Sequence, residues 1–195
     1  MPSHRAVLLV ALAAAVAGAA AGVYWSGPRL DRTQAPAPAT AADATVAVAD
    51  IGAPMPPLTL PGLDGQPVDL AARYRGRPLL INAWASWCGP CVEEMPALDA
   101  FARSQGARGV QVIGLALDTP EAVRAFLTRV PVHYPIVHQL PAADDASVRL
   151  GNGQGVLPYS VLIGADGRIL KRKLGPFRPG ELEAWTRGAE IQTND

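Results

Sequence analysis

The chain has 195 residues, of which 49% are hydrophobic, and its 17 basic residues balance its 17 acidic residues. This length fits one domain of ordinary size, and the zero net charge gives no support for nucleic-acid binding, which normally needs a basic face. The two cysteines, Cys88 and Cys91, exclude a disulfide-rich scaffold and offer no four-ligand structural zinc site.

The N-terminus contains a long apolar run without charge, from Ala6 to Pro28. As a helix it would be about 34 Å long, enough to cross a hydrocarbon core about 30 Å thick. Tyr24 and Trp25 lie at its far end, where aromatic side chains favour the membrane–water interface. We therefore expect residues 1–32 to be an uncleaved membrane anchor. A signal peptide cleaved near residues 19–21 is the alternative, and a buried soluble helix fits least, because the run has no polar face.

Residues 33–50 are rich in alanine and proline and contain no aromatic residue. Such a segment cannot bury enough apolar surface to offset the entropy of ordering it, so we predict an extended tether. Residues 51–195 are then expected to form the folded domain, because helical and strand patterns alternate through them.

The domain is predicted to begin with a hairpin around a Gly-Leu-Asp-Gly turn and to continue with buried strands and amphipathic helices. Thr119 is expected to cap the helix that Pro131 ends. The predicted strands are 58–60, 67–70, 79–85, 110–117, 134–137, 159–163 and 168–174, and the predicted helices are 89–104, 120–130, 144–150 and 179–189.

This order of elements predicts an α/β fold with a central mixed sheet. Strands that alternate with helices imply parallel crossovers with helices on both faces of the sheet, and the last two strands add an antiparallel edge. The basic run Lys171-Arg172-Lys173 lies on the last strand. We expect it to discourage further pairing at that edge, with weak attraction to anionic lipid as the alternative.

The two cysteines lie three residues apart at a strand–helix junction, in Trp87-Cys88-Gly89-Pro90-Cys91. The unpaired amides and dipole of a helix N-terminus lower a thiol pKa from about 8.5, and the resulting thiolate attacks disulfides. Cys91, within the first turn, can then attack the mixed disulfide. Gly89 and Pro90 form the turn without blocking Cys88, and Trp87 supplies an apolar wall. The pattern predicts a redox dithiol rather than an inert pair or half of a zinc site.

This motif resembles the active site of the thioredoxin superfamily, and in particular of the exported TlpA/ResA-like thiol–disulfide oxidoreductases. The resemblance covers about residues 51–189. Pro96 matches the proline that kinks the family's active-site helix, and Leu157-Pro158 resembles its substrate-binding cis-proline loop. Residues 119–137 correspond to the helix–strand insert of the subfamily. The resemblance therefore implies a thioredoxin-like fold with an N-terminal hairpin and this insert.

The resemblance also implies site roles. The substrate-binding residues would be Trp87, Gly89, Pro90, Leu157 and Pro158. Glu94 matches the acidic position of C-x-x-E, one turn from Cys91, and would act as an acid/base or pKa-tuning residue. The alternative for Glu94 is an ordinary acid that complements the helix dipole. Asn82 stands where thioredoxin carries a buried Asp, so the proton of Cys91 needs another acceptor.

From these features we expect an exported protein-disulfide reductase of the periplasm, tethered to the inner membrane. Its only redox group would be the Cys88–Cys91 disulfide, with no cofactor and no metal. Its partners would be disulfide-containing exported proteins, in settings such as cytochrome c biogenesis, and a membrane thiol donor of the DsbD/CcdA type. The Gly-Pro dipeptide favours reduction: thioredoxin, which shares it, has a potential near −270 mV, against about −120 mV for the oxidant DsbA.

Two other functions stay open. A peroxiredoxin-like peroxidase is a related redoxin, although Ala85-Ser86-Trp87 lacks the Pro and Thr/Ser that precede a peroxidatic cysteine. A copper-delivery module like the Sco proteins uses a three-residue spacer and a distal histidine. Here the spacer has two residues, and His133 and His138 fall on opposite faces of a predicted strand.

Overall fold

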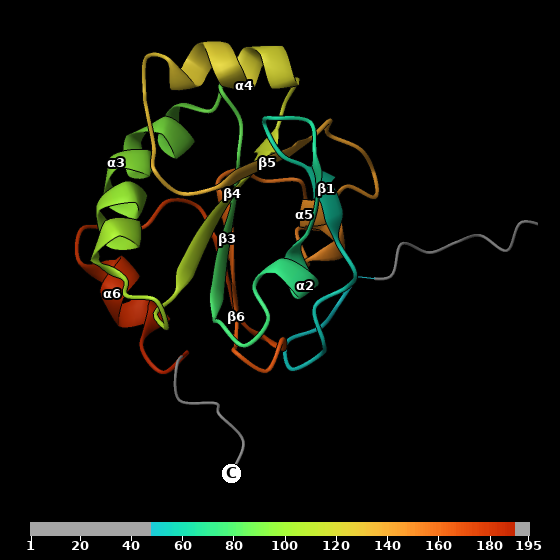
Figure 1. The fold of residues 1–195 in the computed structure, drawn as a ribbon, viewed down its shortest axis with the longest axis vertical. Helices are drawn as coiled ribbons and strands as arrows, with labels where there is room; N and C mark the ends of the chain where they lie inside the picture. The colour runs from blue at the N-terminus through green and yellow to red at the C-terminus, as the bar shows by residue number, and fades with distance from the viewer. Residues whose placement is uncertain (1–47, 190–195) are drawn as a thin grey trace, which may run out of the picture. The chain divides into compact units, whose positions relative to one another are not determined.

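The computed structural model describes residues 48–189 (Figure 1). The predicted anchor and nearly all of the predicted tether lie outside the described residues. Within the described range, no helix is long and apolar enough to cross a membrane. The elements in chain order are β1 (Thr59–Pro61), β2 (Pro67–Asp69), α2 (Leu70–Arg73), β3 (Leu79–Trp84), α3 (Gly89–Ser104), β4 (Gln111–Leu117), α4 (Pro120–Leu127), β5 (Ile136–Gln139), α5 (Ala146–Arg149), β6 (Tyr159–Ile163), β7 (Ile169–Leu174) and α6 (Glu181–Thr186).

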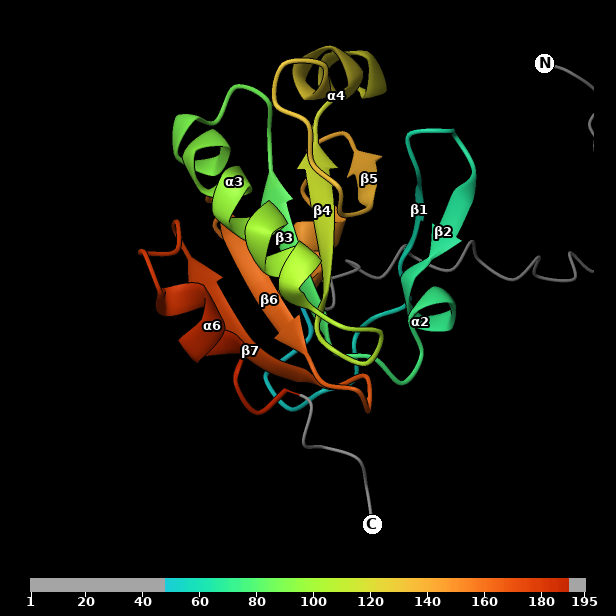
Figure 2. The ribbon, with the colours of Figure 1, turned by 60° about the vertical axis from the view of Figure 1, so that its left-hand side comes forward.

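A five-stranded mixed sheet with the order β5-β4-β3-β6-β7 forms the centre of the domain (Figure 2). β3, β4 and β5 are parallel and are connected through α3 and α4, whereas β6 runs antiparallel to β3 and β7 antiparallel to β6. β1 and β2 form a separate antiparallel hairpin. The predicted mixed sheet is confirmed, and so are the hairpin, the helix–strand insert of α4 and β5, and the antiparallel edge.

Helices cover both faces of the sheet, and β3 shows why. Leu80 and Trp84 belong to one buried cluster, which includes residues of α3, α4 and α6. Leu79, Ile81 and Ala83 belong to a second buried cluster, with residues of β1, α2 and α5. Figure 1 shows α3 and α6 on one side of the sheet and α2 and α5 on the other. Because alternate residues of a strand face opposite sides, a strand covered on both faces is apolar throughout.

Five local predictions need correction. The helix α4 ends at Leu127 and not at the predicted residue 130, because the chain turns there with a hydrogen bond from the Arg129 N–H to the Phe126 carbonyl. The helix α2 was missed because its four residues are too few to show a helical period; Asp69 caps it by accepting a hydrogen bond from the Ala72 N–H. β5 begins two residues later than predicted, since Pro135 has no N–H to donate to the ladder. α5 begins only after Asp145, whose side chain caps it. α6 begins two residues later than predicted because Gly180, which precedes it, has φ 75°, a left-handed conformation that favours glycine. It ends at Thr186 and not at residue 189, because Arg187 leaves the helical conformation with ψ 136°.

The basic residues of β7 do more than protect an edge. β7 is an edge strand, as the prediction required. However, Lys171 Nζ donates to the carbonyl of Trp185, and Lys173 Nζ bonds Glu181 Oε1, each at 2.8 Å. Both lysines therefore attach α6 to the sheet.

Candidate functional site

The two cysteines lie where β3 ends and α3 begins. Cys88 is the N-cap of α3, with extended backbone angles, and Gly89 and Pro90 are the first two helical residues. Proline suits this position because an N–H in the first turn has no partner inside the helix. Cys88 and Cys91 are joined by a disulfide, with their Cα atoms 5.3 Å apart. The sequence therefore places the redox pair at the N-terminus of the longest helix among the described residues.

The two sulfur-bearing residues differ in access. Cys88 is 6% exposed, whereas Cys91 has no exposed surface. Trp87 is 70% exposed, and Gly89 and Pro90 are exposed as well. The surface around Cys88 is thus formed by an aromatic ring and a short turn, and Cys91 lies beneath it.

A side chain just beyond the neighbouring strand β4 holds the loop between β3 and α3. Ser86 Oγ donates to Asp118 Oδ2 at 2.5 Å, and the Ser86 backbone N–H donates to the same oxygen at 3.3 Å. Sequence reasoning missed Asp118, although a signal was present. It is the first charged residue after the apolar strand β4, whose C-terminal end lies at the same edge as that of its parallel neighbour β3.

The predicted proline loop lies at the same end of the sheet as the cysteines. The Leu157–Pro158 peptide bond is cis, as the resemblance implies. In the antiparallel register, Tyr159 pairs with Ala83, so Pro158 lies beside the end of β3 from which the cysteine loop begins. Leu157 packs against the buried cluster that contains both cysteines.

Glu94 lies one turn beyond Cys91 and is only 5% exposed. Its Oε1 accepts a hydrogen bond from Asn82 Nδ2 at 2.8 Å, and its Oε2 accepts one from the Phe177 N–H at 3.0 Å. Burial raises the pKa of Glu94, because desolvation disfavours the carboxylate; the two hydrogen bonds and the charge of Lys173 offset only part of this effect. The structure therefore holds a buried carboxyl group whose proton is retained to higher pH than that of an exposed glutamate.

Asn82 connects Glu94 to the proline-loop strand. It is fully buried on β3, and its amide also donates to Ser160 Oγ at 3.1 Å. Sequence reasoning found Asn82 and Glu94 but missed Ser160 and Phe177. Their contacts depend on the register of β3 against β6 and on the path of the β7–α6 loop, for which the sequence carries no local signal.

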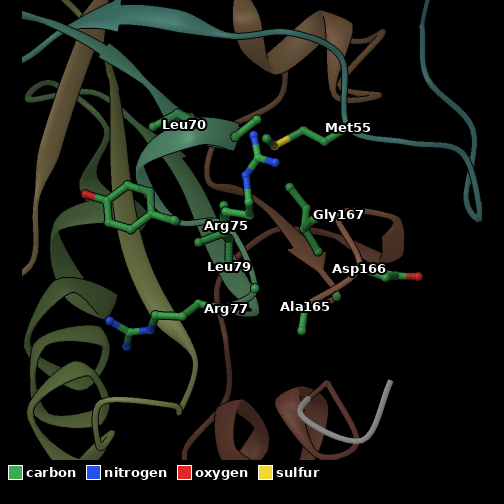
Figure 3. Close-up of a pocket in the computed structure, with 13 residues that line it drawn as sticks. Met55, Leu70, Arg75, Arg77, Leu79, Ala165, Asp166 and Gly167 are labelled. Carbon is green, nitrogen blue, oxygen red and sulfur yellow. The ribbon is translucent and has the colours of Figure 1, made fainter. Parts of the chain in front are cut away.

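A separate cavity of about 260 Å³ lies at the opposite end of β3. Met55, Arg75, Leu79 and Gly167 are among the residues around it (Figure 3). Leu79 is the first residue of β3, and the cysteine loop follows its last residue, Trp84. At about 3.3 Å per residue, the strand separates the two sites by roughly 17 Å. This cavity therefore does not belong to the redox site.

His133 and His138, the histidines of the copper-delivery alternative, join no metal-ion cluster in the part of the chain that the structure describes. Within residues 48–189, no group of three or more His, Cys, Asp or Glu side chains is placed to hold a metal ion. His133 contacts Asp99 instead, through its backbone N–H at 2.6 Å and its ring Nδ1 at 3.1 Å.

Comparisons with known proteins agree with this site. The Redoxin family matches residues 50–186. Thiol-disulfide oxidoreductase ResA of Bacillus thuringiensis is 30% identical over 137 residues, which cover 69% of this chain and 76% of that protein. Sporulation thiol-disulfide oxidoreductase A of Bacillus subtilis is 27% identical over 124 residues, 60% of this chain and 72% of that protein. The crystal structure of a thioredoxin-related protein from Neisseria meningitidis serogroup B has a TM-score of 0.60 and 32% identity, and the match covers 68% of this chain and 99% of that one. This chain therefore belongs to the Redoxin family and is a ResA-like thiol–disulfide oxidoreductase of the thioredoxin superfamily.

Proposed function

We propose that the protein is an exported protein-disulfide reductase in which Cys88 attacks and Cys91 resolves. The observation that carries the proposal is the difference in access between the two cysteines at the start of α3. Cys88 retains exposed surface and Cys91 has none, so a substrate disulfide meets Cys88 first. At the N-cap, the first-turn N–H groups and the helix dipole stabilise the Cys88 thiolate.

The reaction consumes one substrate disulfide and oxidises one dithiol. The Cys88 thiolate attacks one sulfur of the substrate disulfide, which forms a mixed disulfide, and the released substrate thiolate takes up a proton. Glu94 accepts the proton of the Cys91 thiol, and the Cys91 thiolate attacks the Cys88 sulfur. The Cys88–Cys91 disulfide forms, and the second substrate thiolate leaves and is protonated. Two electrons and two protons move from the enzyme to the substrate.

Five residues around the dithiol are assigned to substrate binding. Trp87, Gly89 and Pro90 supply the exposed surface around Cys88. Leu157 and Pro158 supply backbone at the adjacent end of β6. An extended segment of the substrate would lie between these two groups, with its disulfide over Cys88.

Three further points complete the proposal. The apolar run at 6–28 supports export to the periplasm and tethering to the inner membrane. There, disulfides persist and a disulfide-exchanging enzyme has substrates, cytochrome c precursors among them. A membrane thiol-transfer protein of the DsbD/CcdA type would reduce the oxidised enzyme again. The Gly-Pro dipeptide supports the reducing direction, and a measured potential above about −150 mV would instead indicate an oxidase.

Trapping tests the assignment of the nucleophile. Cys91→Ser should accumulate a mixed disulfide between Cys88 and its substrate, since the resolving thiol is gone; mass spectrometry then identifies the partner. Cys88→Ser is the matched control and should trap little. Equal trapping by the two variants would overturn the assignment.

A further inference from the structure

A second cavity, of about 460 Å³, lies beside the first residue of β6 and the last residues of β7. It is lined by the glycine-rich loop 151–154 and by residues of β6 and β7: Tyr159, Arg172, Lys173 and Leu174. Tyr159 directly follows Pro158 and pairs with Leu174 across β6 and β7. The cavity therefore opens at the end of the sheet where the redox site lies.

Arg172 has an unusual environment in this cavity. Its Nε and Nη2 atoms are buried and have no hydrogen-bond partner among the residues that the structure describes. The guanidinium lies directly against the backbone of Gly151, at a place that a Cβ on that residue would occupy. Gly151 also has φ 111°, so glycine is required here both by conformation and by close approach. The loop thus holds the guanidinium in one position.

The charge of Arg172 is not balanced by the cavity walls. No acidic residue lines the cavity. The neighbouring Lys173 is already paired with Glu181, and the Tyr159 hydroxyl donates to the Leu150 carbonyl at 2.9 Å. An acceptor of opposite charge that enters this cavity therefore gains a charge-assisted hydrogen bond with Arg172 that no wall residue supplies.

The chemistry of the guanidinium indicates the kind of acceptor. Arg172 as a whole is half-buried and lines the cavity, and a carboxylate pairs with a guanidinium through charge-assisted hydrogen bonds. In β7, Arg172 lies opposite Val161, three residues beyond Pro158. At about 3.3 Å per strand residue, it lies roughly 10 Å along β6 from the proline loop.

We propose that this cavity is a carboxylate-binding subsite, which takes an acidic side chain of the substrate polypeptide while the substrate disulfide lies over Cys88. The subsite rests on the proposed function, since it selects the substrate of the same reaction. An extended chain advances about 3.3 Å per residue, so about three residues of the substrate span the length of β6 between the proline loop and Arg172. The enzyme therefore prefers disulfides with a nearby Asp or Glu on one side.

Binding of non-reactive peptides tests the subsite without the redox reaction. The peptides carry Ser in place of the reactive cysteine, with Glu or Gln at each position up to five residues on either side. Titrated against the oxidised full chain, the Glu peptide should bind about tenfold tighter than its Gln counterpart at one position, as expected for a charged hydrogen-bonded pair. Arg172→Gln should abolish this preference. Arg168→Gln, which changes an exposed arginine at the other end of the same hairpin, should retain it.

Several outcomes would overturn the subsite. One is equal binding of Glu and Gln peptides by the wild type at every position, a comparison that needs no variant to fold. Another is a Glu preference that survives in Arg172→Gln. A third is Arg172-dependent binding of acetate or inorganic phosphate without any peptide preference, because the cavity would then take free anions.

Disulfide-bonded versions of the same peptides separate this proposal from the proposed function. If the reduced enzyme cleaves Glu and Gln peptides with equal kcat/KM, and the non-reactive peptides also bind equally, the subsite fails and the reductase stands. If no peptide disulfide is reduced but Arg172-dependent Glu binding persists, the reductase fails and the subsite stands.

Discussion

Replacing Glu94 by Gln should slow the resolving step while leaving the first attack by Cys88 nearly unchanged. The carboxyl group lies one turn from the buried Cys91, and burial raises its pKa. Gln has the same shape but accepts no proton. The hydrogen bonds can be kept: the Asn82 amide can rotate so that its Oδ1, which has no partner among residues 48–189, accepts from the new Gln amide. The substitution therefore removes a proton acceptor and little else.

The structure sets the size of the expected effect. General bases contribute about 10²–10⁴-fold to a rate. Glu94 lines a cavity of about 380 Å³ between α3 and the β7–α6 loop, so water can act as a slower proton acceptor in its place. We therefore expect the lower end of the range, a decrease of about 100-fold in the resolution rate, equal to about 2.7 kcal/mol of barrier.

Stopped-flow measurement on a preformed mixed disulfide at Cys88 isolates this step. The wild-type rate should rise with pH as Glu94 ionises, and the Glu94→Gln rate should lose that rise. Glu93→Gln, which changes the exposed acid next to it, is the control and should behave like the wild type. A Glu94→Gln rate within threefold of the wild type, with an unchanged pH profile, would refute the role in proton transfer.

The same group links stability to pH. Because the folded pKa of Glu94 lies above the unfolded value, the folded state binds this proton more tightly. Its contribution to stability is fully present below the unfolded pKa, about 4.3, and is lost as pH rises through the folded pKa. Glu94→Gln has no such loss. The free energy of unfolding of the variant, relative to that of the wild type, should therefore be higher at pH 7 than at pH 4.5, as denaturant titrations at both pH values would show.

Two further substitutions test the packing around the site. Burial opposes the ionisation of Asp99, but hydrogen bonds from His133 and the charge of Arg103 outweigh this effect and lower its pKa. Asp99→Asn should therefore lower the free energy of unfolding by about 1–2 kcal/mol at pH 7. This loss of stability should vanish as the pH falls below about 4 through the folded pKa. Urea titrations that show the same cost at both pH values would contradict this. Gly114→Ala should destabilise the domain by about 1–3 kcal/mol, since the new Cβ would meet Ile136 Cδ1 and lie 3.1 Å from Trp84 Nε1. A thermal midpoint equal to the wild type would show that the core adapts.

The elements that carry the dithiol could be predicted from sequence because each has a strong local signal. The apolar run of β3 is bounded by Pro78, and both ends of α3 agree with the prediction. Cys88 and Pro90 mark the start of α3, where a cap and a first-turn proline satisfy helix geometry. By contrast, α2 spans a single turn, so no period in the sequence distinguishes it from a loop.

The surroundings of Glu94 show what local patterns omit. Glu94 lies three residues after Cys91 in the same helix, so its place one turn beyond Cys91 can be predicted from sequence spacing alone. Its hydrogen-bond partners come from β3 and from the segment before α6, 12 and 83 residues away along the chain. Ser160 joins them only because β6 pairs with β3 in one register. Burial and pKa follow from these distant contacts, so the sequence could suggest the residue but not the chemical state of its carboxyl group.

The basic run of β7 shows the same limit in a charge pattern. Lys171, Arg172 and Lys173 are consecutive, and as a sequence they form one positive patch. A strand divides them, because neighbouring side chains point to opposite faces. The two lysines face α6 and bond to it, while Arg172 faces the other side and lies against Gly151. The alternation of side chains along a strand predicts this division. It does not predict that the loop at Gly151, some twenty residues earlier in the chain, packs against Arg172. The charge that the chain uses to fasten a helix and the charge that we assign to substrate recognition are therefore adjacent in sequence and separated by the thickness of the sheet.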